Sequence, residues 1–138
     1  MKKSVRSLMA IAVFGVSSIA LADGLEDFFR QTVVGNVSTR MFHDQGRYIV
    51  NIGNQMTAMN KAELLDLYQK MKAAGAKIEI ISLKLTNRVD TGNMVSVVLK
   101  AKVRQTVGSS RGEGEVESHE ILLKEGGKYV SVFSLGKQ

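Results

Sequence analysis

The sequence predicts an α+β domain in which two N-terminal helices pack on a bent antiparallel meander of four strands. In two segments after residue 23, apolar side chains recur at the spacing that places them on one face of a helix. After Gly75 the pattern changes, and apolar and polar side chains alternate in four segments separated by glycine-containing turns. Helices followed by antiparallel strands are typical of α+β folds.

The first predicted helix begins after Asp23. Its apolar residues fall at positions i, i+3, i+4 and i+8: Leu25, Phe28, Phe29 and Val33. The second predicted helix covers residues 61–74, with Asn60 as N-cap, Glu63 completing a capping box, and Gly75 just after the last turn. Its apolar face consists of Leu64, Leu67, Tyr68 and Met71.

Residues 35–59 have no clear period, because glycine and asparagine interrupt them repeatedly. Residues 47–52 fit either a short strand or part of a further helix. Both interpretations stay open, so the fold prediction depends on the segments at either side.

The first predicted strand covers residues 77–89, and its apolar positions change parity between Ile80 and Ile81. A change of parity requires one extra residue, so we predict a β-bulge that bends the strand there. A three-residue hairpin loop at residues 90–92 follows, with Gly92 in the left-handed conformation. The second strand places one apolar row on the inner face of the sheet: Val95, Val97, Leu99, Ala101 and Val103.

Charged residues predict how the second and third strands pair. If residues 108–111 form the connecting loop, Arg104 lies opposite Glu115 and Lys102 opposite Glu117. Such pairs stabilise a ladder by roughly 0.2–1 kcal/mol each. A slip by one residue would turn these charges toward the core, which favours the predicted register.

This order of elements resembles the cystatin-like cone, and in particular the nuclear-transport-factor-two-like (NTF2-like) superfamily. The segments that carry the resemblance are residues 25–33, 60–75 and 77–135. The resemblance implies a sheet that curls around the helices and leaves a pocket. It leaves the role open, because the superfamily includes ketosteroid isomerase-like and dehydratase-like enzymes, secretion-system assembly domains and non-catalytic binding modules. Its enzymes place an acidic residue or an Asp-His pair in the cone.

One acidic residue is predicted to point into the domain. The register above places Glu120 on the inner face opposite Leu99, and a two-residue turn at residues 126–127 places it opposite Phe133 on the last strand, which ends near Leu135. Apolar neighbours would raise the pKa of this carboxyl group, as in a general base or a ligand-binding acid. The predicted pocket contains Leu99, Ser118, Glu120, Tyr129, Ser131 and Phe133.

A second interpretation of Glu120 is that it lies at the open mouth of the cone. There it would be solvated or paired with Lys124, and a bulge in the third strand would turn it outward. The sequence alone favours this simpler interpretation over a catalytic one.

The outer face of the sheet is predicted to carry an apolar patch: Val98, Ile121, Leu123, Val130 and Val132. Such an apolar patch on a sheet face that would otherwise be exposed to solvent usually marks an interface. Sheet-to-sheet dimers are common in the superfamily that the chain resembles, so we expect a homodimer or docking onto an envelope protein. The alternative is that residues 35–59 cover this face.

Few other residues of the sequence are candidates for catalysis or metal binding. His43 and His119 are the only histidines, and neither has the spacing of metal ligands. His43 and Asp44 fit an oriented base, but we expect surface positions for both histidines. The absence of cysteine excludes disulfides and thiol catalysis, and no Gly-x-Ser-x-Gly motif is present. We expect neither a metal nor a cofactor.

Residues 1–22 have the three-part pattern of a cleavable export signal: Lys2, Lys3 and Arg6, an apolar run over residues 8–20, and a cleavage site at residues 20–22. We expect a single mature domain, residues 23–138, in the periplasm or secreted, without stable membrane insertion. The signal carries three of the 19 basic residues and none of the 13 acidic ones, which leaves a net charge of +3. Because these basic residues do not cluster, we expect no nucleic-acid partner.

These observations predict an exported, non-enzymatic domain that binds a small apolar ligand or an envelope protein. One alternative is a small lyase or isomerase that uses Glu120 as general base. Another is a structural subunit of a secretion or envelope assembly.

Overall fold

The structure, a computed structural model, describes residues 24–137, and the predicted export signal lies outside these residues. Within them, two α-helices and a short 3-10 helix accompany one six-stranded sheet. The helices are α2 (Leu25–Val33), η1 (Thr39–Met41) and α3 (Lys61–Ala73). The strands are β1 (Phe42–Ile52), β2 (Gln55–Met59), β3 (Lys77–Thr91), β4 (Met94–Val107), β5 (Ser110–Glu125) and β6 (Lys128–Gly136). No helix in this part of the chain is long and apolar enough to span a membrane.

Both predicted helices are confirmed. α2 buries most of its predicted apolar face: Leu25, Phe28 and Phe29. α3 begins with the predicted capping box, in which the Glu63 N–H donates to Asn60 Oδ1 at 2.9 Å and the Asn60 N–H donates to Glu63 Oε1 at 3.0 Å. Gly75 follows α3 with φ 78°, a conformation that ends many helices.

The sheet is larger than the predicted four-stranded meander. Its strand order is β2-β1-β6-β5-β4-β3, and the meander forms the part from β6 to β3. The two additional strands come from residues 35–59, where β1 and β2 form a hairpin with Gly53 and Asn54 at the turn, both with positive φ. β1 pairs with β6 in parallel, whereas all other neighbours are antiparallel, so the sheet is mixed.

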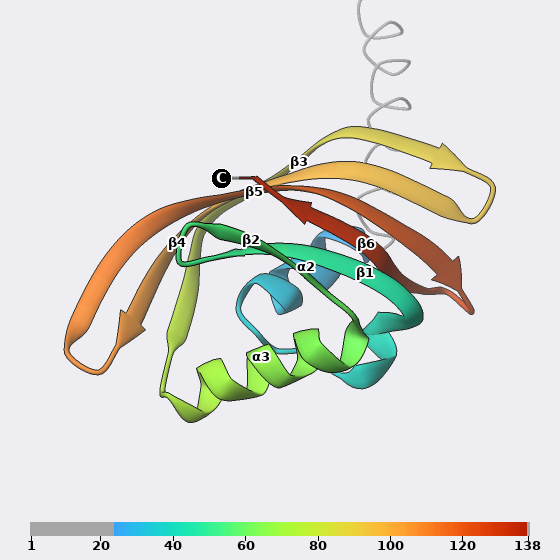
Figure 1. The fold of residues 1–138 in the computed structure, drawn as a ribbon. Coiled ribbons are helices and arrows are strands. Elements are labelled where there is room, and N and C mark those ends of the chain that lie inside the picture. The colour runs from blue at the N-terminus through green and yellow to red at the C-terminus, as the bar shows by residue number, and fades with distance from the viewer. Residues whose placement is uncertain (1–23, 138) are drawn as a thin grey trace, which may run out of the picture.

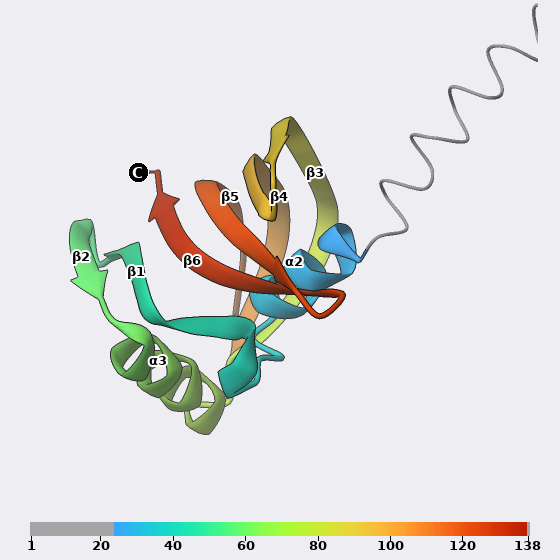
Figure 2. The same cartoon turned by 90° about the vertical axis from the view of Figure 1, so that its right-hand side faces the viewer.

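The sheet curls around the helices. In Figure 1 the long strands β3, β4 and β5 arch above α2 and α3. Figure 2 shows α2 on the hollow side of the strands from β3 to β6, and α3 below β1. Accordingly, α2 packs into an apolar cluster with β4, β5 and β6, while Leu64 of α3 packs with Phe42 and Tyr48 of β1.

Strand β3 bends where the sequence predicts a bulge. Its pairing with β4 shifts between Ile80 and Ser82, which confirms the extra residue inferred from the change of parity. The loop after β3 is shorter than predicted, because Thr91 already pairs with Met94. Gly92, with φ 61°, therefore belongs to a two-residue turn, whose twist matches that of the strands.

The predicted register between β4 and β5 is wrong by two residues. Val107 pairs with Ser110, so the turn contains two residues instead of four. Arg104 consequently faces Glu113, with 3.1 Å between guanidinium nitrogen and carboxylate oxygen, and Lys102 faces Glu115. Because side chains alternate with a period of two, an even slip leaves every side chain on its predicted face. The predicted inner row of β4 is buried throughout: Val95, Val97, Leu99, Ala101 and Val103.

Candidate functional site

A polar row crosses three strands on the inner face of the sheet. Glu120 of β5 pairs with Ser134 of β6, and Ser134 pairs with Tyr48 of β1. On its other side Glu120 pairs with the apolar Val97 of β4. Ser118, two residues before Glu120, lies on the same face and is buried like it. The row therefore gathers a carboxyl group and three hydroxyl groups inside the cone.

Glu120 is buried, so the interpretation that placed it in solvent is wrong. Only 7 % of its surface is exposed. The Ser134 hydroxyl group donates a hydrogen bond to Glu120 Oε2 at 2.5 Å. Burial raises the pKa of Glu120 from 4.5 to about 7, and the hydrogen bonds from Ser118 and Ser134 limit the rise because they favour the charged form. Glu120 therefore changes charge near neutral pH.

The predicted register would place Phe133 opposite Glu120. Instead, β6 has an extra residue at Val132, and this bulge puts Ser134 opposite Glu120. Phe133 pairs with Ile121, so it lies on the outer face, and the prediction that it lines the pocket is wrong. Because the bulge is in β6 and not in β5, Glu120 keeps its inward direction.

The other predicted pocket residues are buried on the inner face, but not all lie beside Glu120. Leu99 pairs with Ser118 and belongs, with Tyr129, to the apolar cluster around α2. Arg88 Nη2 donates to the Tyr129 hydroxyl group at 3.3 Å. Lys124, the predicted partner of Glu120, has its amino group 5.7 Å from the centre of the Tyr129 ring. Ser131 of β6 is buried where the chain approaches β1.

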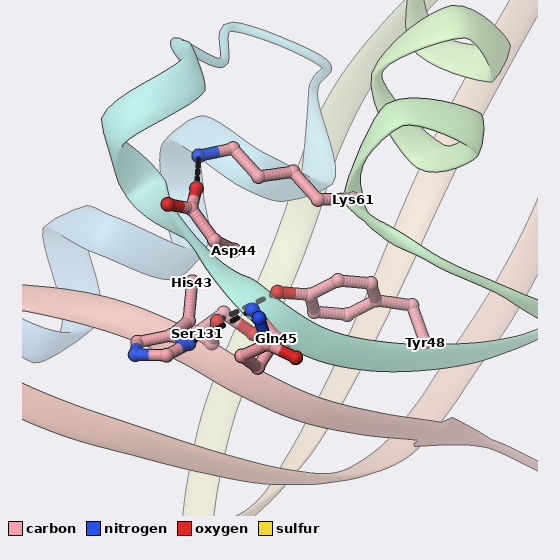
Figure 3. A network of polar contacts seen from close by, with 6 residues as sticks. All are labelled: His43, Asp44, Gln45, Tyr48, Lys61 and Ser131. Atoms are coloured by element: carbon pink, nitrogen blue, oxygen red, sulfur yellow. Dashed lines mark hydrogen bonds and ion pairs between the residues drawn. The ribbon is translucent and has the colours of Figure 1, made fainter.

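Tyr48 fills a gap between β1 and β6. Their parallel pairing is interrupted between Phe42 and Arg47. The Tyr48 side chain reaches into this interval and donates a hydrogen bond to the Ser131 carbonyl oxygen at 2.7 Å (Figure 3). Gly46 permits this position, because a β-carbon there would overlap the Tyr48 hydroxyl group and ring. Burial raises the pKa of Tyr48 to about 12, so the phenol keeps its proton.

A cavity of about 410 Å³, here called the α2–α3 pocket, lies where the end of α2, α3 and the start of β3 meet. Its apolar wall includes Val37, Tyr68, Met71 and Ile78. Lys72 and Lys77 also line it. Tyr68 also packs against the cluster of Phe42 and Tyr48, and burial, and secondly the charge of Glu120, raise the pKa of Tyr68 to about 12.

A second cavity of about 510 Å³, the hairpin pocket, lies between α2, η1 and the turn that joins β5 to β6. Phe28, Met41 and Tyr129 supply its apolar surface. Asp27, Arg40, Glu125 and Lys128 add two charges of each sign. Neither pocket is lined by Glu120.

Three residues near Glu120 are absent from the sequence-based set: Tyr48, Tyr68 and Ser134. The sequence indicated that Tyr68 is buried, since it lies on the apolar face of the second predicted helix. Tyr48 and Ser134 had none, because their positions depend on the β1–β6 pairing and on the bulge at Val132.

The histidines form no catalytic pair. The His43 Nδ1 atom accepts a hydrogen bond from the Gln45 N–H at 3.0 Å, while Asp44 pairs with Lys61 at 2.9 Å (Figure 3). The interpretation of His43 and Asp44 as an oriented base is therefore wrong. His119 is exposed and pairs with Val98. Among residues 24–137, no three potential metal ligands of the His, Asp or Glu type gather.

The predicted outer patch is partly open. Its residues Ile121, Leu123, Val130 and Val132 are half-buried, whereas Val98 is buried. Leu123 pairs with Val130, and Phe133 joins the patch through its pairing with Ile121. Residues 35–59 do not cover this face, because their strands extend the sheet beside β6.

Comparisons with known proteins identify the fold. No family model and no curated protein matches the sequence. An NTF2-like protein with a cystatin-like fold from Novosphingobium aromaticivorans matches with a TM-score of 0.55 and 13 % identity, over 89 % of this chain and 86 % of that one. A Xanthomonas campestris protein assigned as a calcium/calmodulin dependent protein kinase II association domain matches with a TM-score of 0.58 and 12 % identity, over 87 % and 84 %. A Streptomyces avermitilis protein assigned as a dehydratase of the NTF2-like family matches with a TM-score of 0.52 and 14 % identity, over 66 % and 63 %. The chain therefore has the NTF2-like fold, a cystatin-like cone.

Proposed function

We propose that the chain is an exported, non-catalytic domain that binds a small apolar ligand in the α2–α3 pocket. The observation that carries this proposal is the pocket itself, a cavity of about 410 Å³ with apolar side chains from α3, from the start of β3 and from the segment that follows α2. Its volume lies within the range of roughly 300–1,000 Å³ that is typical of binding sites for small molecules, and its wall combines apolar side chains with polar groups. Export is supported by the pattern of residues 1–22.

The position of Glu120 favours binding over catalysis. A general base must come within hydrogen-bond reach of the proton that it removes. Glu120 does not line the α2–α3 pocket, and its Oε2 atom is already bound by Ser134. The fold itself does not decide the role, since one similar structure named above is assigned as an association domain and another as a dehydratase.

Filling the pocket tests the proposal. Met71→Trp adds bulk to the pocket wall, whereas Gln69→Trp adds the same bulk to an exposed position of α3. The fluorescent, uncharged probe N-phenyl-1-naphthylamine is expected to bind the wild type and Gln69→Trp equally. The affinity of the probe for Met71→Trp should fall at least tenfold, because the indole occupies the part of the pocket that the probe would fill. Equal affinity for both variants would place the binding site elsewhere.

The second candidate function is that of a small lyase or isomerase with Glu120 as general base. One observation favours it, namely a pKa of about 7, which suits proton transfer at neutral pH. Any turnover that Glu120→Gln abolishes without unfolding the chain would replace the binding proposal by this one.

The outer face supports a further proposal, a homodimer through the patch of Ile121, Leu123, Val130, Val132 and Phe133. Val132→Asp places a charge in the patch, while Val107→Asp places one at the exposed end of β4. In size-exclusion chromatography with light scattering, the wild type and Val107→Asp are expected to be dimers at micromolar concentration and Val132→Asp a monomer. A monomeric wild type contradicts the dimer and favours an envelope protein as the partner of this face.

A further inference from the structure

The interior of the protein contains two apolar clusters. The first joins α2 to the inner face of β4, β5 and β6, and Val97 and Leu122 belong to it. The second joins β1 to α3 through Phe42, Tyr48 and Leu64. The helix α3 therefore packs with β1 and not in the cluster around α2.

Polar groups lie between the two clusters on the inner face of the sheet. Glu120 belongs to neither cluster, and it pairs with Val97 of the first one. Ser134 pairs with Glu120 on one side and with Tyr48 of the second cluster on the other. The Tyr48 hydroxyl group donates to the Ser131 carbonyl oxygen at 2.7 Å in the same region. We call Glu120, Ser131, Ser134 and the Tyr48 hydroxyl group the polar seam.

The pairing that closes this seam is short and interrupted. β1 pairs with β6 at Phe42 and then again only from Arg47 to Ile49, and parallel pairing is slightly less stable per residue than antiparallel pairing. Figure 2 shows β1, β2 and α3 grouped on one side of β6. These elements are contiguous in the sequence, and Gly75, with φ 78°, follows them as a hinge. Contiguous motifs of this kind often open as cooperative units.

Ionised Glu120 has no counter-charge at the seam. Its paired neighbours on β4 and β6 are uncharged, and so is Ser118 on its own strand. β1 and α3 contribute the phenols of Tyr48 and Tyr68, whose pKa values of about 12 keep them protonated, and the buried residues of α2 are apolar. Among residues 24–137, no cationic side chain shifts the pKa of Glu120. A buried carboxylate without a counter-charge is strongly disfavoured, so ionisation favours any state in which water reaches Glu120.

We propose that β1, β2 and α3 open away from β6 as one unit along the polar seam when Glu120 ionises. The β1–β6 pairing and the hydrogen bond from Tyr48 to Ser131 are then lost, and water solvates the carboxylate. The cluster around α2 stays packed. Protonated Glu120 suits the closed state, because a neutral carboxyl group needs no counter-charge. The unit is therefore closed below neutral pH and opens more often above it, and this device goes beyond the proposed binding function and does not rest on it.

A single introduced thiol reports the opening, because the chain has no cysteine. Ser131→Cys places the thiol at the seam, whereas Val95→Cys places it in the cluster around α2, and both positions are almost fully buried. The rate of labelling by an aromatic disulfide reagent is divided by the rate for the urea-unfolded chain at the same pH. With a Glu120 pKa of about 7 in the closed state and 4.5 when exposed, the corrected rate for Ser131→Cys should rise about 30-fold from pH 5.5 to pH 8. Val95→Cys should be labelled much more slowly at both pH values.

Two further variants and the wild type complete the test. In the Ser131→Cys background, Glu120→Gln should abolish the pH response, whereas Glu115→Gln should keep it, because Glu115 is an exposed acid. Hydrogen exchange of the wild type at pH 8 needs no substitution. The amides that join β1 to β6 should lose protection, and those of α3 and β4 should keep it. Equal labelling of the two cysteine variants, a pH response that persists with Glu120→Gln, or loss of protection in α3 together with β1 overturns the inference.

Discussion

Glu120→Gln is expected to raise the free energy of unfolding by about 3 kcal/mol at pH 8 and to leave it nearly unchanged at pH 4. The reason is the rise of the Glu120 pKa from 4.5 to about 7 on folding. Between these two values the unfolded chain releases the proton while the folded chain keeps it, so stability falls as pH rises. At about 1.4 kcal/mol per pH unit, this loss reaches about 3 kcal/mol, and it is complete above the pKa of the folded state. Glutamine has no proton to release.

Urea unfolding at pH values from 4 to 9 measures this difference. Glu115→Gln serves as the control, because Glu115 is an exposed acid on the outer face of the same strand. Its stability curve should stay within about 0.5 kcal/mol of the wild type, as for most surface substitutions. Parallel curves for wild type and Glu120→Gln across this pH range would show that Glu120 is solvated, contrary to its burial.

Gly46→Ala is expected to lower the free energy of unfolding by about 3 kcal/mol, at the upper end for overpacking of a core. A methyl group at this position would occupy the space of the Tyr48 hydroxyl group and ring. Tyr48 would have to leave its buried site and would lose its hydrogen bond to Ser131. Its side chain would then no longer pack where the pairing of β1 with β6 is interrupted. The effect should therefore also appear as faster amide exchange in β1 and β6.

Gly114→Ala provides the comparison for this substitution. Gly114 also lies in a strand, but a β-carbon there meets no atom within 4 Å. Its replacement is expected to be neutral or slightly stabilising, because alanine restricts the unfolded chain more than glycine does. If both alanine variants were equally stable, the close approach of Tyr48 to Gly46 would not contribute to the fold.

Local signals were sufficient for much of the fold. The capping box of Asn60 and Glu63 fixed the start of α3, and the change of parity at Ile80 located the bend in β3. The inward direction of Glu120 was also predicted from the sequence, although the register was not. An error of two residues in an alternating strand changes the neighbours of a side chain without changing its face.

The rest of the site depends on contacts between distant segments. Tyr48 and Ser131 are 83 residues apart in the sequence. Their strands pair in parallel, so no hairpin turn between them indicates the pairing. Asp44 and Gly46 also stand at the positions of β1 that share the parity of Phe42 and Tyr48, so the sequence shows no apolar alternation that would mark the strand there. Val132, the bulge residue of β6, is an ordinary apolar strand residue in the sequence, so Phe133 was predicted on the wrong face.

Methionine methyl groups can report directly whether a small apolar ligand binds in the α2–α3 pocket. Met71 lines this pocket, Met41 lines the hairpin pocket, and Met94 is exposed at the turn between β3 and β4. With ¹³C-methyl-labelled methionine, N-phenyl-1-naphthylamine should shift the NMR signal of Met71 in a saturable manner and leave those of Met41 and Met94 in place. A shift of Met41 with no change at Met71 would move the site to the hairpin pocket and contradict the account.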